Sequence, residues 1–143
     1  MAKRISPEEA RDLIEKEGYV YVDVRSVPEF EAGHPTGAYN VPLMNLGPSG
    51  MAPNPDFLDV MKRAFPKDAR LVVGCKAGGR SARAVAALEQ AGYINVVDQR
   101  AGFDGAPDPS GRIAEPGWRP KGLPVSKDAA RDHTYDGLKS APR

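Results

Sequence analysis

The chain has 143 residues, the size of one ordinary domain, and its 20 basic and 19 acidic side chains leave a formal charge of +1. This balance provides no general electrostatic field for nucleic acid or an anionic membrane, so we expect neither as a partner. The chain has one cysteine, which excludes a secreted domain held together by disulfides within the chain. The N-terminus has no apolar signal stretch, and no apolar run is long enough to span a bilayer, so we expect a cytoplasmic protein.

A helix is predicted near the N-terminus. Ser6 is suited to cap its free amide groups, Pro7 fits the first helical position, and Glu9 completes a capping box. Gly18 is the expected stop. The β-branched and aromatic residues that follow, at 19–24, predict a strand.

The rest of the chain alternates short apolar runs with helical patterns. In chain order we expect a short helix at 28–32, a short strand at 38–41 and a helix at 54–65. A buried strand at 71–73, a helix at 81–91 and a strand at 94–97 follow. This alternation predicts an α/β domain with a central, mostly parallel sheet flanked by helices. Residues 101–124 are rich in Gly and Pro and predict an irregular segment. We place the domain at residues 1–125 and a polar, mobile tail at 126–143.

One run carries the chemistry: Cys75 directly follows the buried strand and precedes a helix. In a parallel sheet, ligands bind beyond the carboxyl ends of the strands. The loop from Cys75 to Arg80 contains two glycines, which let backbone amides turn toward a bound anion, and the helix adds its positive N-terminal end. Lys76 and Arg80 supply cations that favour a thiolate. A cysteine after a strand is often only a small buried hydrophobe, but this surrounding pattern favours a nucleophile.

Four segments resemble the rhodanese family, and they occur in that family's order. The loop at 75–81 begins with cysteine, has arginine as its sixth residue and continues with serine. Residues 22–25 resemble the family's Asp-Val-Arg segment. The other two matches are residues 33–42, and Trp118 together with the Gly-Leu-Pro-Val sequence at 122–125. The chain departs from the family by a Pro/Gly-rich insertion before this tryptophan, which leaves the wall of the pocket open to question.

The resemblance implies a single rhodanese-like α/β domain without metal or organic cofactor. It implies a small-molecule sulfur donor such as thiosulfate, from which Cys75 takes sulfur as a persulfide, and a cyanide or thiol acceptor. The loop residues are expected to bind the persulfide and the donor; they are Lys76, Ala77, Gly78, Gly79, Arg80 and Ser81. Asp23 and Arg25 are expected to form a buried pair that supports the loop.

Several of these side chains have two possible roles. Ser81 either hydrogen-bonds the sulfur or caps the helix, and Arg80 either contacts substrate or points away as a scaffold. Lys76 is expected at the entrance to the site. His34 is interpreted as loop packing and His133 as solvent-exposed, and their distance in the sequence argues against a zinc site.

Three other functions remain open. Phosphatases and arsenate reductases of the same fold need a cysteine loop one residue longer, whereas Arg80 closes the shorter loop. A non-catalytic partner-binding module usually lacks the cysteine. A persulfide carrier serving one pathway would use the same chemistry with a different acceptor. Because the chain has no second cysteine, a thiol acceptor must be another molecule.

Overall fold

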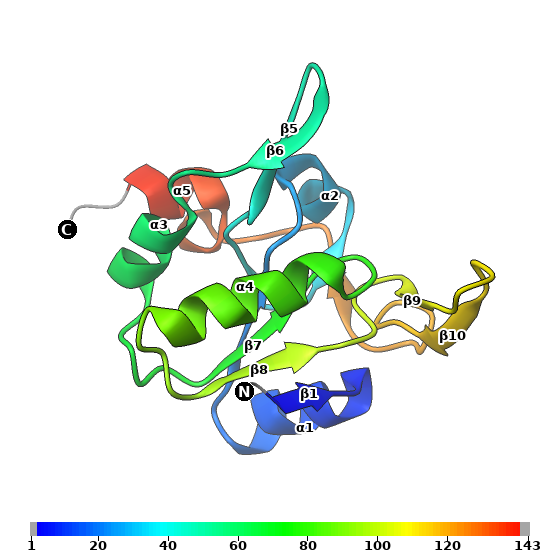
Figure 1. Cartoon of the computed structure of the whole chain (residues 1–143). Coiled ribbons are helices and arrows are strands. Elements are labelled where there is room, and N and C mark those ends of the chain that lie inside the picture. The colour runs from blue at the N-terminus through cyan, green and yellow to red at the C-terminus, as the bar shows by residue number, and fades with distance from the viewer. Residues whose placement is uncertain (1–2, 141–143) are drawn as a thin grey trace.

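A five-stranded sheet forms the centre of the domain in the computed structural model, which describes residues 3–140. Its strands lie in the order β1 (Lys3–Ile5), β8 (Val96–Gln99), β7 (Leu71–Gly74), β2 (Val20–Asp23) and β4 (Tyr39–Asn40). All neighbouring strands are parallel, which confirms the predicted α/β class (Figure 1). Strand β1 is not predicted from the sequence, because three residues are too few to form a pattern.

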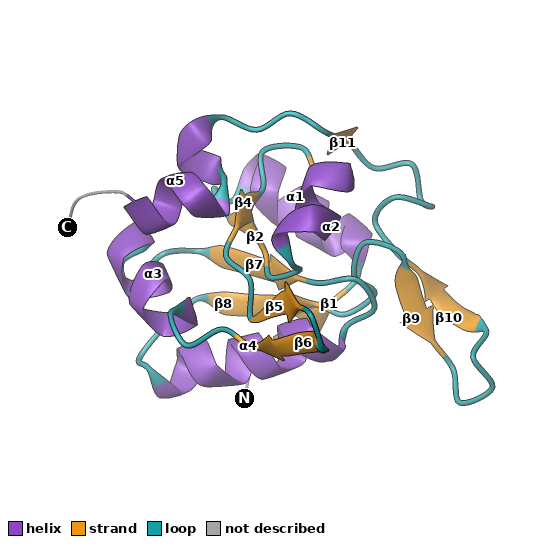
Figure 2. Ribbon diagram, turned by 90° about the horizontal axis from the view of Figure 1, so that it is seen from above, coloured by secondary structure: helices purple, strands orange, loops and turns teal. Residues whose placement is uncertain are grey.

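Helices cover both faces of this sheet. Helix α1 (Pro7–Lys16) lies on one face, and α3 (Phe57–Ala64) and α4 (Gly79–Gln90) lie on the other (Figure 2). Helix α2 (Val27–Ala32) follows β2 directly. The predicted capping box of α1 is confirmed by its reciprocal hydrogen bonds. Among the described residues, none of the helices has the length and apolar character needed to cross a bilayer.

The period-two alternation of the strands divides the core into two clusters. Val22 and Val73 point into the larger cluster under α3 and α4, and Tyr21 and Val72 point into the smaller one beside α1. Both faces of β7 are therefore buried, as the continuous apolar run at 71–73 predicts.

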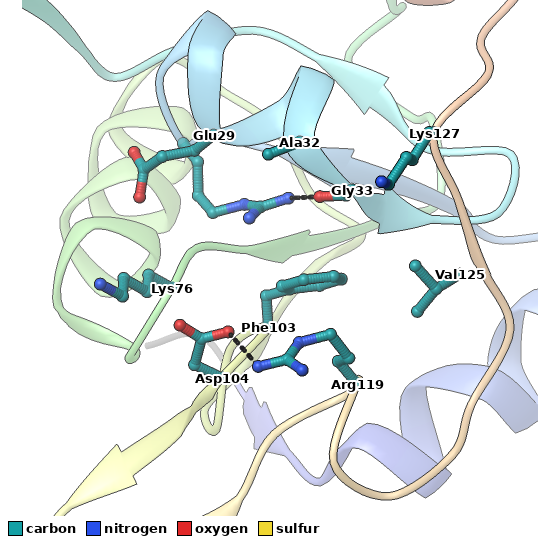
Figure 3. A pocket seen from close by; sticks show the side chains of 10 residues that line it. Glu29, Ala32, Gly33, Lys76, Phe103, Asp104, Arg119, Val125 and Lys127 are labelled. Carbon is teal, nitrogen blue, oxygen red and sulfur yellow. Dashed lines mark hydrogen bonds and ion pairs between the residues drawn. The ribbon is translucent and has the colours of Figure 1, made fainter.

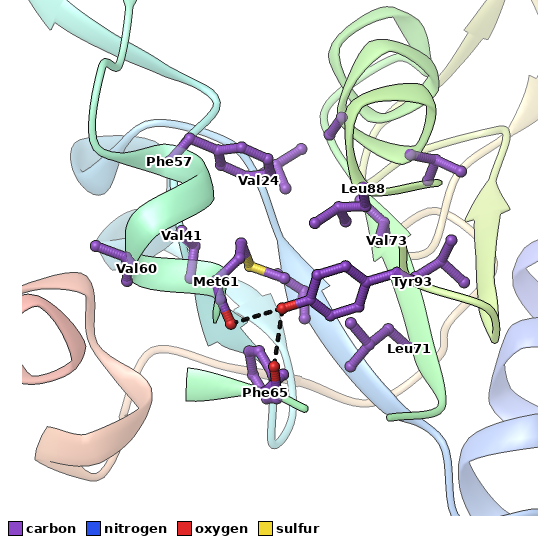
Figure 4. Close-up of a cluster of buried hydrophobic side chains, with 14 of the residues drawn as sticks. Val24, Val41, Phe57, Val60, Met61, Phe65, Leu71, Val73, Leu88 and Tyr93 are labelled. Carbon is purple, nitrogen blue, oxygen red and sulfur yellow. Dashed lines mark hydrogen bonds between the residues drawn. The ribbon is translucent and has the colours of Figure 1, made fainter. Parts of the chain in front are cut away.

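The larger cluster holds α3 against the loop that follows α4 (Figure 4). Tyr93 inserts its ring between these elements and donates its hydroxyl proton to the carbonyls of Met61, at 2.9 Å, and Phe65, at 2.8 Å. Two carbonyls at the end of α3 thereby gain a partner inside the core.

Three small antiparallel pairs lie outside the main sheet, in segments that the sequence predicts mostly as loops. They are β5 (Met44–Gly47) with β6 (Gly50–Pro53), β9 (Gly105–Pro107) with β10 (Ile113–Pro116), and β3 (His34–Pro35) with β11 (Val125–Ser126). Their Gly and Pro content masks strand periodicity in the sequence. The β9–β10 hairpin contains the insertion that precedes Trp118.

The segment after β11 packs against the domain. It forms a 3-10 turn, η1 (Arg131–His133), and helix α5 (Tyr135–Ser140), and Tyr135 and Leu138 are buried in the larger core. The predicted domain end at residue 125 therefore places two core side chains in the predicted tail. The sequence does not reveal them, because two apolar residues three positions apart form too short a pattern to detect. Residues 1–2 of the predicted domain and residues 141–143 of the predicted tail lie outside the described residues.

Candidate active site

Cys75 lies at the carboxyl end of β7, in the middle of the sheet, and at the start of the loop that leads into α4. Its thiol is buried, with 2% of the residue exposed. The loop turns back on the sulfur: the backbone N–H of Gly78 donates to Sγ at 3.1 Å. Gly78 adopts a left-handed conformation with φ +102°, and an added Cβ would collide with the carbonyl of Arg100. Glycine is therefore required at this position by both conformation and space.

Ser81, in the first turn of α4, is the second group beside the sulfur. The Cys75 thiol donates to Ser81 Oγ at 3.5 Å, and Ser81 donates its own proton to Asp98 Oδ1 at 2.6 Å. Of the two roles expected for Ser81, the structure therefore shows the contact with sulfur. The other oxygen of Asp98 accepts from Arg4 Nε at 2.8 Å.

Asp98 and Arg4 are members of the site that the sequence analysis misses. Asp98 is 1% exposed in β8, and β1 places Arg4 directly beside it in the parallel register. The one local signal is an acidic residue directly after the two valines that begin β8. A buried carboxylate needs a charged or hydrogen-bonding partner, and here it has both kinds.

Arg80 closes the loop and points away from the thiol, toward α2. Its guanidinium forms a bidentate pair with Glu29, with Nη1–Oε1 at 2.7 Å and Nη2–Oε2 at 3.0 Å. Glu29 also accepts from the backbone and hydroxyl of Ser26. Burial alone would raise the pKa of Glu29, but these hydrogen bonds outweigh it and lower the pKa to about 2. The same pair raises the pKa of Arg80. This geometry corresponds to the scaffold role, one of the two roles expected for Arg80.

Glu29→Gln should lower the free energy of unfolding at pH 7 by about 1–3 kcal/mol, given the partial exposure of the pair. The pKa of Glu29 in the folded state lies below the ordinary value of 4.5 for a glutamate side chain. Such a carboxylate stabilises the fold fully above its unfolded-state pKa and loses this contribution as pH falls through the folded-state value of about 2. The difference between wild type and variant should therefore shrink between about pH 5 and pH 2 in urea unfolding.

Glu31, exposed on the same helix, is the matched control for this measurement. Glu31→Gln should change stability by less than about 0.5 kcal/mol at any of these pH values. A difference in the free energy of unfolding between wild type and Glu29→Gln that stays constant from pH 7 to pH 3 would contradict the electrostatic role assigned to Glu29.

Asp23 and Arg25 form the buried pair that the sequence analysis expects, at the carboxyl end of β2. Arg25 Nη2 donates to Asp23 Oδ2 at 2.7 Å and to the carbonyl of Gly33 at 2.6 Å, and Arg25 Nε donates to both oxygens of Asp23. Burial alone would lower the pKa of Arg25, but the bonds to Asp23 more than offset it, and the pKa is raised. The pair ties β2 to the turn after α2.

An open pocket of about 460 Å³ lies beside the cysteine loop (Figure 3). Its lining combines basic, acidic and apolar groups; the residues are Arg25, Glu29, Ala32, Gly33, Lys76, Phe103, Asp104, Arg119, Val125 and Lys127. Lys76 is exposed there, as expected for an entrance residue. Cys75, which precedes Lys76 in the chain, is buried and is not among the residues that line the pocket. Ala77 and Gly79 are exposed in the loop without lining this pocket.

Residues on both sides of the insertion line the pocket: Phe103 and Asp104 before it and Arg119 after it. The β9–β10 hairpin projects outward (Figure 1), and its two ends meet where Gly117 N donates to the carbonyl of Asp104 at 3.3 Å. Trp118 N then donates to the carbonyl of Gly102 at 2.9 Å, so the chain resumes its path beside the loop. Trp118 is 3% exposed, which agrees with a core role.

The two histidines have packing contacts. His34 stacks on Phe30, and its ring nitrogens contact the carbonyls of Phe30 and Asp128. His133 is half-buried and stacks on Tyr39 with ring centroids 3.7 Å apart. The prediction that His133 is solvent-exposed is wrong, because α5 and η1 bring this segment back onto the sheet edge.

The chain resembles known proteins over most of its length. The family model described as "Rhodanese-like domain" matches residues 6–106. Thiosulfate sulfurtransferase 16, chloroplastic, of Arabidopsis thaliana is 40% identical over 116 residues, which cover 81% of this chain and 86% of that protein. The crystal structure of Rv0390 from M. tuberculosis superposes with a TM-score of 0.73 and 27% identity, over 89% of this chain and 98% of that one.

A further relative matches only part of this chain. Protein HIGH ARSENIC CONTENT 1, mitochondrial, of Arabidopsis thaliana is 40% identical over 86 residues, covering 60% of this chain. The chain spans about half of that protein, 51%, and the same share of two other curated plant relatives.

Proposed function

Because the chain belongs to the rhodanese-like domain family, we propose that it is a sulfurtransferase that carries sulfane sulfur as a persulfide on Cys75. The observation that carries the proposal is the position of the thiol. It lies at the carboxyl end of the central strand and at the N-terminal end of α4, with a backbone N–H donating to the sulfur. Both the helix end and the amide favour negative charge on sulfur.

The proposed reaction has two displacements. In the first, the Cys75 thiolate attacks the outer sulfur of thiosulfate, the S–S bond of the donor breaks, and sulfite leaves with the electron pair. In the second, cyanide or an external thiolate attacks the outer sulfur of the persulfide, and Cys75 leaves as the thiolate. The amides of the loop would hold the negative charge of the persulfide, and the cations of the adjacent pocket would attract the anionic donor.

Intact-mass measurement tests this proposal. After incubation with thiosulfate, the protein should gain the mass of one sulfur atom, and cyanide should remove it. Protein alkylated beforehand with iodoacetamide should gain no sulfur. Failure to gain sulfur, together with hydrolysis of an aryl phosphate or reduction of arsenate, would instead support the alternative enzyme class of the same fold.

A further inference from the structure

A buried carboxylate that the two proposed displacements do not use lies beside Cys75. Asp98 belongs to β8, which lies between β1 and β7 in the sheet, and its side chain is 2% exposed (Figure 1). Its Oδ1 accepts from Ser81 in α4 and its Oδ2 from Arg4 in β1, so both oxygens have partners from other elements. Because apolar residues of similar size often replace a buried ion pair without loss of stability, the fold alone does not account for this charge.

Asp98 determines where the proton of Ser81 points. A carboxylate paired with a guanidinium only accepts hydrogen bonds, so Ser81 donates its single proton to it, at the 2.6 Å typical of a charge-assisted bond. The carbonyl of Gly78, at 3.2 Å, is a more distant and uncharged acceptor for the same proton. Ser81 therefore turns only lone pairs toward Sγ of Cys75, 3.5 Å away. A thiol can donate to these lone pairs, whereas a thiolate needs a donor.

The charge of Asp98 acts in the same direction. The contacts from Sγ to Ser81 Oγ and from Oγ to Oδ1, 3.5 and 2.6 Å, place this carboxylate oxygen about 6 Å or less from the sulfur. At such a distance inside a protein, a like charge works against negative charge on the sulfur. Arg4 offsets part of this effect, but its side chain is 54% exposed, so solvent screens its charge more strongly than that of Asp98.

The other titratable groups around Cys75 are neutral, exposed or paired. Tyr21, from β2, stays neutral because burial raises its pKa. Lys76 is exposed to solvent. The remaining groups form pairs of opposite charge, which are Arg80 with Glu29, Arg25 with Asp23, and Arg119 with Asp104. The contact through Ser81 therefore gives Asp98 a direct path to the sulfur in addition to its charge.

We propose that Asp98 is a positioning residue that holds the Ser81 proton away from Cys75 and keeps the resting cysteine in its thiol form, with Arg4 moderating this effect. The inference rests on the proposed function, in which Cys75 is the nucleophile. When Cys75 ionises, its proton passes to solvent, and the Ser81 hydroxyl rotates from Asp98 to donate to the sulfur. The same rotation gives the persulfide a donor. Holding the resting group as a thiol limits its oxidation, which proceeds through the thiolate.

Alkylation of Cys75 tests this role, because iodoacetamide reacts with the thiolate and not with the thiol. The alkylation rate is followed by intact mass near pH 6 and near pH 9, and the ratio of the first rate to the second is compared between proteins. This ratio cancels differences in access to the buried sulfur. Formation of the sulfur adduct with thiosulfate is timed at the same two pH values.

Asp98→Asn should raise this rate ratio by roughly 3- to 10-fold. The substitution removes the charge, and the amide turns its oxygen to Arg4 and its NH₂ group to Ser81, which frees the Ser81 proton for the sulfur. Arg4→Gln should lower the ratio by about 1.5- to 3-fold, because it leaves Asp98 without its countercharge. In a Ser81→Ala background, Asp98→Asn should have a smaller effect, because only the charge then acts on the sulfur.

Asp68→Asn and Arg112→Gln are the matched controls. Both side chains are exposed, Asp68 in the turn before β7 and Arg112 in the turn of the β9–β10 hairpin. Neither substitution should change the rate ratio by more than about 1.5-fold, because solvent and salt screen these charges. A purely structural role of Asp98 would lower Tm in Asp98→Asn and Arg4→Gln without changing the ratio in opposite directions.

Each negative result has its own meaning. If Asp98→Asn folds and its rate ratio equals or falls below that of wild type, the role assigned to Asp98 is wrong. If Asp98→Asn does not fold, Arg4→Gln decides, and an unchanged or higher ratio in that variant contradicts the assignment. If the alkylation ratios change as expected but thiosulfate adds no sulfur to the wild type, the proposed function is wrong and the action of Asp98 on the thiol stands.

Discussion

Replacing Cys75 with serine should reduce sulfur transfer from thiosulfate to cyanide by at least about 10³-fold, because the atom that forms the persulfide is removed. A serine hydroxyl is a far weaker nucleophile toward sulfur and forms no equivalent intermediate. The protein should stay folded, since Ser is close in size to Cys and the hydroxyl meets the N–H of Gly78 and the hydroxyl of Ser81. Steady-state thiocyanate formation and thermal unfolding measure the two effects.

Ser81→Ala provides the matched control for this result. It removes the group that contacts the sulfur at 3.5 Å and keeps the nucleophile, so its rate should lie between wild type and Cys75→Ser. It also leaves Asp98 Oδ1 without its serine donor, so some stability should be lost. Transfer by Cys75→Ser at a rate near that of wild type would overturn the assignment of the nucleophile.

Asp23→Asn should lower the free energy of unfolding by about 3–5 kcal/mol, because it leaves the Arg25 guanidinium buried without its countercharge. The two side chains are 2% and 5% exposed, so water does not replace the lost interaction. For a domain of this size, the loss corresponds to a fall in Tm of roughly 10–20 °C. Urea unfolding at pH 7 and calorimetry measure both quantities.

Asp12→Asn is the control for this substitution. Asp12 is 51% exposed and lies 3.8 Å from Arg11, so its replacement should change stability by less than about 0.5 kcal/mol. Replacing the Asp23–Arg25 pair together with apolar residues of similar size should cost less than Asp23→Asn alone, since no charge is then left buried. Equal stability of Asp23→Asn and wild type would show that Arg25 finds another counterion.

The sequence alone is sufficient to predict the fold class and the place of Cys75 at the carboxyl end of the central strand. The strand at 71–73, the loop from Cys75 and the helix at 81–91 are contiguous, so residue type and spacing predict a strand, an anion-binding turn and a helix start. The buried run and the capping box of α1 are likewise local patterns. The roles of the individual loop residues in binding substrate stay predictions for the experiments above.

The tertiary structure decides which side chains complete the site. Asp98 meets Ser81 across 17 positions, Arg80 meets Glu29 across 51, and Arg4 meets Asp98 across 94. No local pattern encodes these pairs, because they depend on the order of β1, β8 and β7 in the sheet and on the direction in which α2 leaves β2. The same holds for Arg119, which the return of the β9–β10 hairpin brings over Phe103. Local patterns determine where the thiol lies in the chain, whereas its charged surroundings come from strand pairing and loop closure between distant segments.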